Sequence, residues 1–512
     1  MTAVLPPPPP RTDRRRALDG FARVLRAEWT KFRTVRGWVI GIAVAALVTV
    51  LIGILATAGP TLNHRPDAIP RGPDGRAVND AFYFVHRTLR GDGSITVPVT
   101  SLTGMISAGP DMRRGVEPWA KAGIIVKDGL RPGSHYAAIM VTGGHGVRMQ
   151  HDYVHDTAAP RAVASARWLR LVRSGETVTG YGSADGARWT RVGSVRLPGL
   201  ATEVRAGAFV ASPMDMAPTS HGATFDPAVA TATFGTAVLT GGWTPGAWKG
   251  GQVGSAGTSG SYTDTLHGGF TESGRGLTVT GAGDIAPIVG GPALGTGYAV
   301  ENLLVGAFAG ILLTAVVGAL FASAEYRRGL IRLTFAASPR RGRVLAAKAL
   351  VIGLSAFLTG LVAAAVAIPL ATMRARGHGF FVLPASAWTQ ARVVAGTALL
   401  FAVASVLALA VATLIRRGAA AVTIIVAVLV LPYVLATGGM LPDGPSAWLL
   451  RVTPAAGFAI QQTLVRYPQV DTVYTPSSGY FPLPPWAGFA VLCAYTAVAL
   501  AAAAHLLRRR DA

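Results

Sequence analysis

Six long apolar stretches alternate with polar segments along the chain, and this pattern predicts its architecture. Each stretch has the roughly 20 apolar residues that a helix needs to cross the hydrocarbon core of a bilayer. None of the six contains Lys, Arg, Asp or Glu. Unpaired backbone groups are too costly in lipid, so such stretches form helices. They lie at residues 38–58, 302–324, 349–373, 393–415, 418–442 and 486–507.

A polar insert at residues 59–297 separates the first stretch from the second. In it, short runs of apolar and β-branched residues alternate with glycine-rich turns, a pattern that predicts a two-sheet, all-β sandwich. Residues 241–284 are also strand-rich, and they form either a closing segment of this sandwich or part of another one. The strands that we predict most plainly lie at residues 122–127, 136–142, 168–173, 177–181 and 189–195.

The remaining segments complete a mixed fold, in which a six-helix α transmembrane bundle carries the all-β sandwich. Between residues 21 and 35, apolar positions recur at helical spacing with basic residues between them, which is typical of a helix lying in the membrane interface. Residues 445–464 are semi-polar, and we expect short helices that dip towards the membrane. The predicted domains are a disordered proline-rich tail at 1–17, the interfacial helix and first span at 18–58, the ectodomain at 59–297, and a five-span core at 298–512 with links at 325–348 and 443–485.

The placement of charge orients these spans. The net charge is +22, which in a soluble protein would indicate nucleic-acid binding. Here, 21 of the 47 basic residues lie in the termini and links on one side of the six spans, and five lie in the two short links on the other side. The positive-inside rule therefore predicts a multi-pass membrane protein with cytoplasmic termini and an extracellular insert, and the arginine-rich composition makes a bacterial plasma membrane the expected location. The excess of arginine over lysine, 42 to 5, is typical of a GC-rich bacterial genome. We expect no nucleic-acid partner and contact with anionic lipid.

Several kinds of chemistry have no motif in the sequence. A Gly-x-x-x-x-Gly-Lys-Ser/Thr loop, a His-Glu-x-x-His motif and a Cys-x-x-Cys pair are all missing, so we assign no catalytic, cofactor or metal site. Cys493 is the only cysteine, which excludes an intramolecular disulfide. One group of polar residues leaves open a metal or catalytic site, although we favour a solvated turn: His145, His151, His155, Asp152 and Asp156.

The spans offer no carboxylate for an ion-coupled relay, because no acid lies in the middle of one. Glu301, at the outer end of the second span, is interpreted as an interfacial residue. Pro369 and Pro432 lie within spans, where each is either a hinge or an ordinary tolerated proline.

Particular segments resemble known families. The run Arg-Ala-Glu-Trp-Thr-Lys-Phe-Arg-Thr-Val-Arg at 26–36, Glu-Tyr-Arg-Arg-Gly at 325–329, the basic runs at 337–348 and the loop at 450–463 together resemble bacterial ABC-2-type transporter permeases. The insert separately resembles concanavalin-like sandwich domains of the DUF1349 type, through residues 91–95, 119–128 and 168–171.

The resemblance implies a permease subunit of an exporter, not itself an enzyme and without a cofactor. It pairs with a second permease chain, as a homo- or heterodimer, and is energised by cytoplasmic ABC ATPase subunits. The resemblance of the insert to concanavalin-like domains implies a glycan ligand for the ectodomain. Trp119, Trp168 and Trp189 are then expected to stack on its sugar rings, unless they belong to the core. The expected contacts with the ATPase lie on the interfacial helix and the 325–348 link: Trp29, Lys31, Arg327, Arg328, Arg332, Arg340 and Arg341.

Two other functions are consistent with parts of this sequence. A membrane-anchored glycan-binding receptor without transport needs the insert but not six spans. A membrane-bound glycan-processing enzyme needs an acid pair, and no pair can be selected from the sequence.

Overall fold

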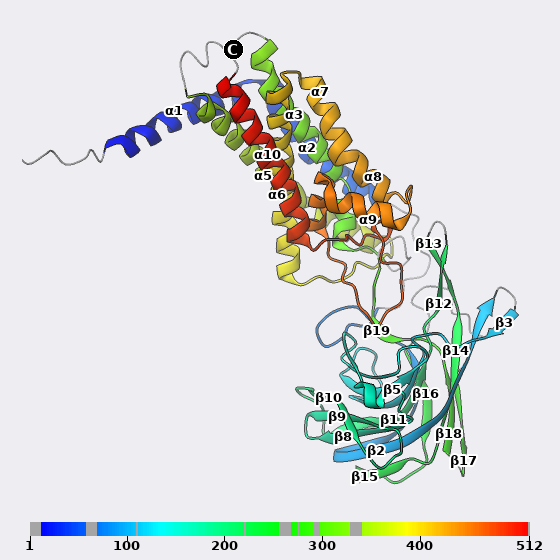
Figure 1. Cartoon of the computed structure of the whole chain (residues 1–512). Coiled ribbons are helices and arrows are strands. Elements are labelled where there is room, and N and C mark those ends of the chain that lie inside the picture. Colours follow the sequence, from blue (N-terminus) through cyan, green and yellow to red (C-terminus); the bar gives the residue numbers. More distant parts are fainter. Residues whose placement is uncertain are drawn as a thin grey trace, which may run out of the picture. The chain divides into compact units, whose positions relative to one another are not determined.

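The computed structural model describes residues 12–57, 69–108, 111–219, 222–254, 268–274, 276–290, 297–327 and 340–509. Within it the chain divides into two compact units. The first, the helical unit, comprises residues 1–62, 298–463 and 475–512. The second, the β unit, comprises residues 63–297 and, in addition, the segment Leu464–Tyr474. Figure 1 labels the elements of both units.

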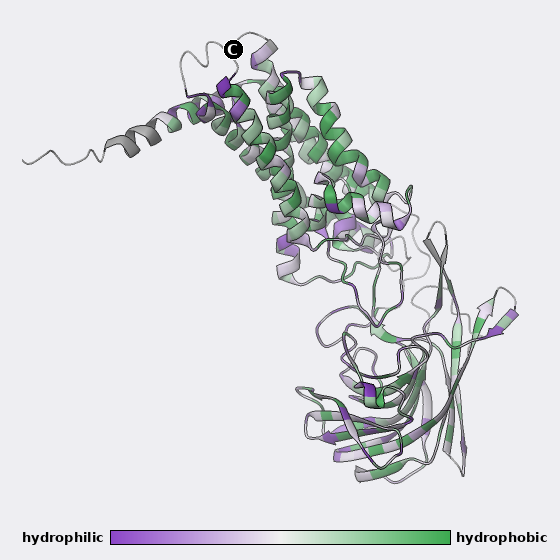
Figure 2. Cartoon of the chain, in the orientation of Figure 1, coloured by the Kyte–Doolittle hydropathy of each residue, from purple (hydrophilic) through white to green (hydrophobic). Residues whose placement is uncertain are grey.

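Among its described residues, the helical unit contains six helices that are long and apolar enough to cross a membrane, as predicted. Figure 2 shows that apolar residues run along these helices, with hydrophilic residues at several of their ends. One span is made of α7, a π-helical turn and α8 in succession. The spans are α2 (Arg36–Ala56), α3 (Ala307–Arg327), α5 (Arg341–Gly377), α6 (Ala387–Ile415), α7 (Gly418–Ile425) with η4 (Val426–Val430) and α8 (Leu431–Thr437), and α10 (Pro485–Arg509).

A further helix, α1 (Thr12–Thr34), precedes the first span and matches the predicted interfacial helix. It starts earlier than expected and includes residues 12–17, which the sequence pattern assigned to the tail. A helix is reasonable there because Thr12 and Asp13 favour helix N-termini and no proline interrupts the turns that follow. The rest of that tail, residues 1–11, lies outside the described residues.

Small residues let the spans approach one another closely. A side chain on Gly306 would lie 2.2 Å from the Thr49 carbonyl oxygen, and one on Gly318 would lie 2.5 Å from that of Ser405. Such contacts are typical of helices packed in lipid, where close backbone approach replaces the hydrophobic driving force. The opposite face of α2 exposes large apolar side chains such as Ile40 and Leu55, 58% and 68% exposed, which suits contact with lipid tails.

The two prolines within spans behave differently. Pro369 lies inside the continuous 37-residue helix α5. Pro432 is the second residue of α8, which follows the π-helical turn Val426–Val430. Because proline cannot donate to the carbonyl four residues earlier, a widened turn before it accommodates the missing hydrogen bond. The helix is therefore irregular near Pro432, whereas α5 continues through Pro369.

The segment before the last span folds into short helices, as predicted. These are α9 (Asp443–Val452) and the 3₁₀ helix η5 (Pro454–Gln461), and all eight residues of η5 are buried. Polar side chains from other elements bind the backbone around its end. Arg392 donates to the Ile460 and Gln462 carbonyls at 2.8 and 2.6 Å, and Glu301 accepts from the Thr463 amide at 2.9 Å. The irregular backbone at the end of η5 is thus satisfied by protein groups.

The β unit is a large, jelly-roll-like and nearly closed β-sheet region, made in its described residues of a 15-stranded sheet and two two-stranded ones, which confirms the predicted all-β fold. All five strands expected from the sequence are present, within one or two residues of the predicted bounds. Its principal strands are β1 (Val78–Asp80), β2 (Phe82–Ala108), β4 (Lys121–Lys127), β5 (Tyr136–Thr142), β6 (Val147–His151), β7 (His155–Ala158), β8 (Trp168–Ser174), β9 (Thr177–Ser183), β10 (Thr190–Arg196), β11 (Glu203–Ala211), β14 (Ala228–Phe234), β15 (Val238–Trp243), β16 (Lys249–Val253), β17 (Gly269–Ser273), β18 (Gly276–Gly281) and β19 (Ile285–Pro287). The shorter strands are β3 (Asp111–Arg114), β12 (Asp215–Thr219) and β13 (Gly222–Asp226).

The 27-residue strand β2 connects the two layers. Its first part pairs with β11, and after Gly91, which has a φ of 61°, its next part pairs with β8. Positive φ is readily adopted by glycine, so the chain can turn from one layer to the other at this point. The main core lies between the layers, with side chains such as Val85, Ile139 and Leu171.

Strands from residues 238–281 belong to this same sheet system and not to another sandwich. β15 and β16 pair with β2, while β17 pairs with β18 and β18 with β14. Of the two arrangements that the sequence left open, the closing segment is therefore the one observed.

Candidate functional sites

Four charged side chains form a compact cluster in the helical unit. The ion-pair cluster consists of Glu28 and Lys31 on α1, Glu325 on α3 and Lys348 on α5. Lys348 Nζ lies 2.7 Å from Glu28 Oε2 and 2.9 Å from Glu325 Oε1. Lys31 Nζ lies 2.8 Å from Glu28 Oε1 and 2.9 Å from Glu325 Oε1. Each lysine thus contacts both carboxylates, and the four formal charges cancel.

The cluster is largely shielded from solvent. Glu28 is 1% exposed and Lys348 is 5% exposed, whereas the Lys31 side chain is 40% exposed. Aromatic rings cover it: the Lys348 ammonium lies 4.5 Å from the centroid of Phe321, and Phe32 packs edge-on against that ring. The cluster therefore joins the end of the interfacial helix to the ends of two spans.

The cluster draws together three segments that are far apart in the sequence. Glu28 and Lys31 lie in the run at 26–36, Glu325 opens the Glu-Tyr-Arg-Arg-Gly motif, and Lys348 ends the run at 337–348, inside α5. We predicted Lys31 as a contact to an ATPase, but not that these residues meet. The sequence did contain a signal for buried charge, because Glu28 and Lys348 are isolated charged residues on helix faces that are otherwise apolar.

The other predicted ATPase contacts fall into three groups. Trp29 is 42% exposed on α1, and Arg340 is exposed at the N-terminus of α5. Arg341 is half-buried and donates to the Leu507 carbonyl at 2.8 Å. Arg327 ends α3, and its side chain lies outside the described residues, as do Arg328 and Arg332. Among the basic residues of the 325–348 link whose side chains the structure describes, Arg340 is thus the exposed one.

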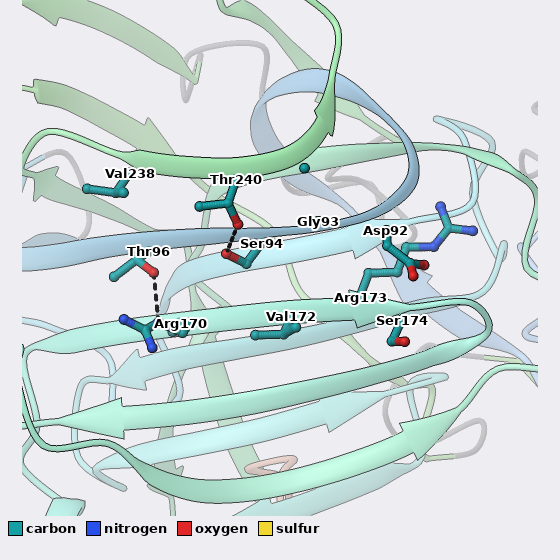
Figure 3. A pocket seen from close by; sticks show the side chains of 11 residues that line it. Asp92, Gly93, Ser94, Thr96, Arg170, Val172, Arg173, Ser174, Val238 and Thr240 are labelled. Carbon is teal, nitrogen blue, oxygen red and sulfur yellow. Dashed lines mark hydrogen bonds between the residues drawn. The ribbon is translucent and has the colours of Figure 1, made fainter.

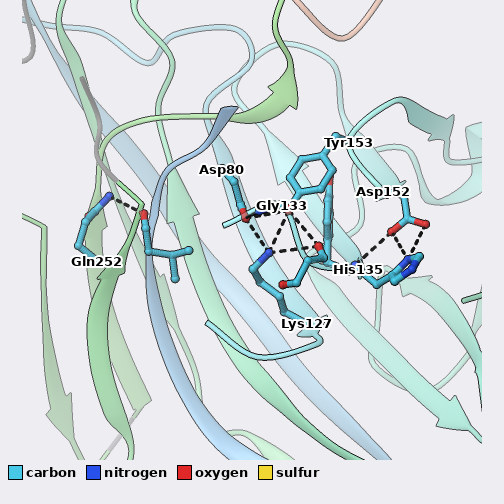
Figure 4. Close-up of polar contacts among 10 residues, drawn as sticks. Asp80, Lys127, Gly133, His135, Asp152, Tyr153 and Gln252 are labelled. Atoms are coloured by element: carbon cyan, nitrogen blue, oxygen red, sulfur yellow. Dashed lines mark hydrogen bonds and ion pairs between the residues drawn. The ribbon is translucent and has the colours of Figure 1, made fainter. Parts of the chain in front are cut away.

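In the β unit, a second polar network surrounds a lysine with no exposed surface (Figure 4). Lys127 Nζ on β4 lies 2.7 Å from Asp80 Oδ2 and donates to the Tyr153 hydroxyl at 3.0 Å. Asp80 also accepts from the Tyr153 hydroxyl at 2.7 Å and from the Gly133 amide at 2.8 Å. Burial lowers the pKa of the Lys127 ammonium, and it raises that of the Tyr153 hydroxyl. The network ties the centre of the sheet to the strand by which the chain enters the unit.

The other end of β4 carries a similar pair. Lys121, also without exposed surface, binds Asp284 and donates to the Ile285 carbonyl at 2.9 Å. Nearby, Glu117 is 2% exposed. Burial, and then the negative charge of Asp284, raise the pKa of the Glu117 carboxyl to about 8. This pair ties the same strand to the segment by which the chain leaves the unit.

The segment Leu464–Tyr474 is held in the β unit by a buried glutamine. Gln469, 2% exposed, donates to the Val154 carbonyl at 3.1 Å and to the Tyr153 carbonyl at 3.4 Å. Asp152 and Tyr153 have φ angles of 46° and 69°, which non-glycine residues seldom adopt. Side chains compensate for this backbone, since Asp152 contacts His135 at 3.1 Å. The link between the fifth and sixth spans thus supplies part of the β unit, which the sequence pattern did not predict.

The three tryptophans predicted to stack on a ligand lie in different surroundings. Trp119 is 2% exposed and stacks on His145, with ring centroids 4.0 Å apart. Trp168 is half-buried at the start of β8. Trp189 is half-buried, and the guanidinium of Arg170 lies 3.9 Å from its ring centroid. The structure does not bring the three together into one platform.

An open groove of about 610 Å³ crosses the outer face of β8, β2 and β15 (Figure 3). We call it the Arg170 groove. Arg170 Nε donates to Thr96 at 3.0 Å, and the hydroxyls of Ser94 and Thr240 are 2.8 Å apart. Its lining residues are Asp92, Gly93, Ser94, Thr96, Arg170, Val172, Arg173, Ser174, Val238, Thr240 and Gly241. No motif in the sequence pointed to it.

The histidines and aspartates between 145 and 156 are dispersed by the fold. His151 and His155 stack with centroids 4.3 Å apart, while Asp156 pairs with Arg148. Burial, followed by the charge of His155, lowers the pKa of His151 to about 4. Within the ranges that the structure describes, no three His, Cys, Asp or Glu side chains form a group that could hold a metal ion.

Fold and sites together have the build of a multi-pass membrane protein with a β-sandwich unit. No protein-family model matches the chain, and no curated protein matches it. Among solved structures, it is similar to one described as a functionally unknown protein from Saccharomyces cerevisiae. The identity is 16%, the match covers 36% of this chain and 87% of that chain, and the TM-score is 0.21. At this TM-score the similarity carries no argument about fold or function.

Proposed function

We propose that the chain is the permease subunit of an ATP-binding-cassette exporter of the ABC-2 type, driven by ATPase subunits on separate chains. Its β unit lies outside the cell in this proposal and handles a ligand of the cell envelope, such as a glycan. Two permease chains pair, as identical or different subunits, and the absence of a P-loop from this sequence requires a partner to bind ATP.

The observation that supports this proposal most directly is the ion-pair cluster. A transporter driven from the cytoplasm needs a stiff connection between the surface that the ATPase pushes and the helices that move. The cluster joins α1, α3 and α5 through four charge contacts of 2.7–2.9 Å. A push on α1 or on the start of α5 is thereby transmitted to α3, whose equilibrium between two states the ATPase can bias.

The charge pattern supports the orientation. The basic residues concentrate in the termini and in the link that joins α3 to α5, which the positive-inside rule assigns to the cytoplasm. With six spans, the insert between the first and second then faces the exterior. α5, at 37 residues, is about 55 Å long, so its basic ends project beyond the hydrocarbon core of roughly 30 Å.

The test is whether a stoichiometric ATPase accompanies the full-length chain purified from its native host. We expect a P-loop protein and ATP hydrolysis in the purified complex. Arg340→Glu should reduce the recovered ATPase several-fold, because Arg340 is exposed at the start of α5. Arg374→Glu is the matched control, being an exposed arginine near the opposite end of the same helix. If the chain purifies intact without any ATPase, or if the two variants behave alike, the proposal fails.

A further inference from the structure

The Arg170 groove combines an arginine, an aspartate, hydroxyl groups and valines on the outer face of three strands. Its floor is β2, and its walls are β8 on one side and β15 on the other, with which β2 pairs over Ser94–Thr96. Thr96 on the floor is only 7% exposed. A groove of about 610 Å³ is in the size range of small-ligand sites.

Arg170 is held in a fixed position at one end of the groove. Its guanidinium lies over the ring of Trp189 at 3.9 Å, and its Nε donates to Thr96 at 3.0 Å. In the part of the chain that the structure describes, no carboxylate lies within ion-pairing distance of Arg170, and no hydrogen bond engages its two terminal nitrogens. A stacked, oriented guanidinium with free donors binds carboxylates in a two-pronged manner.

Hydroxyl groups and valines occupy the middle of the groove. Ser94 and Thr240 face one another across β2 and β15 with their oxygens 2.8 Å apart, and each can donate or accept. Val172 and Val238 provide apolar surface beside them. This mixture suits a sugar ring, which presents hydroxyls at its edge and C–H groups on its faces.

The far end of the groove carries both charges. Asp92 lies four residues from Thr96 along β2, roughly 13 Å for extended strand, and its Oδ1 accepts from the Gly175 amide at 2.6 Å. Arg173 lines the same end, but its guanidinium is buried and donates to the Gly175, Thr202 and Ala201 carbonyls. The two ends therefore offer a ligand different groups, which are guanidinium donors at Arg170 and a carboxylate acceptor at Asp92.

We infer that the Arg170 groove binds an acidic saccharide, with a sugar carboxylate on Arg170 and neutral hydroxyls towards Asp92. This inference rests on the proposed role of the β unit in handling an envelope glycan, and it specifies the chemical class of that ligand. Trp189, predicted to stack on a sugar, instead holds the arginine that binds one.

The experiment uses the full-length chain in lipid nanodiscs, because Leu464–Tyr474 is part of the β unit and an isolated insert would lack it. The probes are an oligomer of galacturonic acid and the same oligomer with its carboxylates methyl-esterified. We expect saturable binding of the acid and at least 10-fold weaker binding of the ester. Arg170→Gln should weaken binding of the acid at least 10-fold. Arg170→Lys keeps the positive charge but loses the planar guanidinium with its paired donors, so it should weaken binding by a smaller factor.

Arg191→Gln is the matched control, since Arg191 is exposed on β10 of the same sheet and outside the groove. It should bind like the unaltered chain. Equal affinity for acid and ester, no saturable binding, or equal effects of Arg170→Gln and Arg191→Gln would each overturn the inference. A thermal melt of each variant shows that the loss is not one of folding.

Recovery of the ATPase is measured on the same preparations, so the two proposals can fail separately. Loss of saccharide binding with the ATPase still present would contradict the inference about the Arg170 groove but not the proposed permease. Saccharide binding by a chain that carries no ATPase would support the inference about the groove and contradict the proposed permease.

Discussion

The two units bury lysines in different ways. In the β unit, Lys121 and Lys127 have no exposed surface, and each pairs with one carboxylate. In the helical unit, Lys348 is shared by two glutamates, which both also contact Lys31. Lys31 has a side chain that is 40% exposed, so this cluster reaches water. In the β unit, the Lys127–Asp80 pair has no exposed side-chain surface, and Asp284, the partner of Lys121, is 13% exposed.

The difference matches what each set of charges holds together. The β-unit pairs attach one strand, β4, to the entering and leaving segments of the chain, at Asp80 and Asp284. A sealed pair is costly to break, because the remaining charge has no water. The ion-pair cluster joins three helices, and its half-exposed member can exchange a partner for water at lower cost. The sealed Lys127–Asp80 pair thus fixes β1 to β4, whereas the cluster can hold its three helices together through Lys348 even when Lys31 is hydrated.

The largest expected effect follows from opening the sealed pair. Lys127→Met keeps most of the side-chain volume but leaves Asp80 buried without its cation, which should destabilise the β unit by about 3–5 kcal/mol. Hydrogen–deuterium exchange of β4 and β11 peptides in the full-length chain measures this. Lys249→Met, at an exposed lysine of the same unit, should change stability by less than about 0.5 kcal/mol. Adding Asp80→Asn to Lys127→Met should recover part of the loss; no difference between the two lysine variants would contradict the sealed pair.

A smaller effect is expected from the ion-pair cluster, and it separates its two lysines. Lys348→Met should destabilise the packing of α1 on α5 by about 2 kcal/mol, less than a sealed pair because Lys31 still neutralises part of the charge. Lys31→Met should cost less than about 1 kcal/mol, since its partly exposed side chain is screened by water. Exchange of α1 amides in nanodiscs gives both values. Equal losses of stability in Lys31→Met and Lys348→Met would show that the difference in burial between the two lysines has no energetic effect.

The last prediction is a dependence of stability on pH at Glu117. Because the pKa of Glu117 in the folded chain is about 8, above its ordinary value of 4.5, the folded state holds this proton more tightly than the unfolded state. The stabilisation is complete below about pH 4.5 and is lost as the pH rises through 8. Between pH 6.5 and 8.5 the melting temperature of the β unit should therefore fall, and Glu117→Gln should flatten this part of the profile. A slope that is the same in the variant would assign the dependence to other groups.

Much of the fold could be predicted from local patterns. The six spans are continuous apolar runs of about 20 residues, and strands such as β4 and β5 are short β-branched runs between turns. The start of α1 was placed too late, because a proline-rich tail gave no sign of where helical residues begin. The attachment of Leu464–Tyr474 to the β unit had no local signal, since Gln469 and Val154 lie 315 residues apart.

The candidate sites were less predictable than the fold. Glu28, Glu325 and Lys348 belong to segments singled out by their resemblance to a family, yet nothing in their spacing shows that they meet. Trp119, Trp168 and Trp189 were selected by residue type, and their exposure and neighbours depend on how turns and strands pack. The Arg170 groove is built from three strands, β2, β8 and β15, that are distant in sequence.

By itself the sequence determined that this chain has six apolar helices, an inserted all-β unit and a one-sided distribution of basic residues. These properties depend on local hydrophobicity, turn residues and charge, which need no knowledge of long-range contacts. The tertiary structure decided which buried charges neutralise one another, that the 464–474 link belongs to the β unit, and that Arg170 rather than a tryptophan faces the groove. A buried charge is tolerated only where folding brings a partner to it, and that partner can come from any part of the chain.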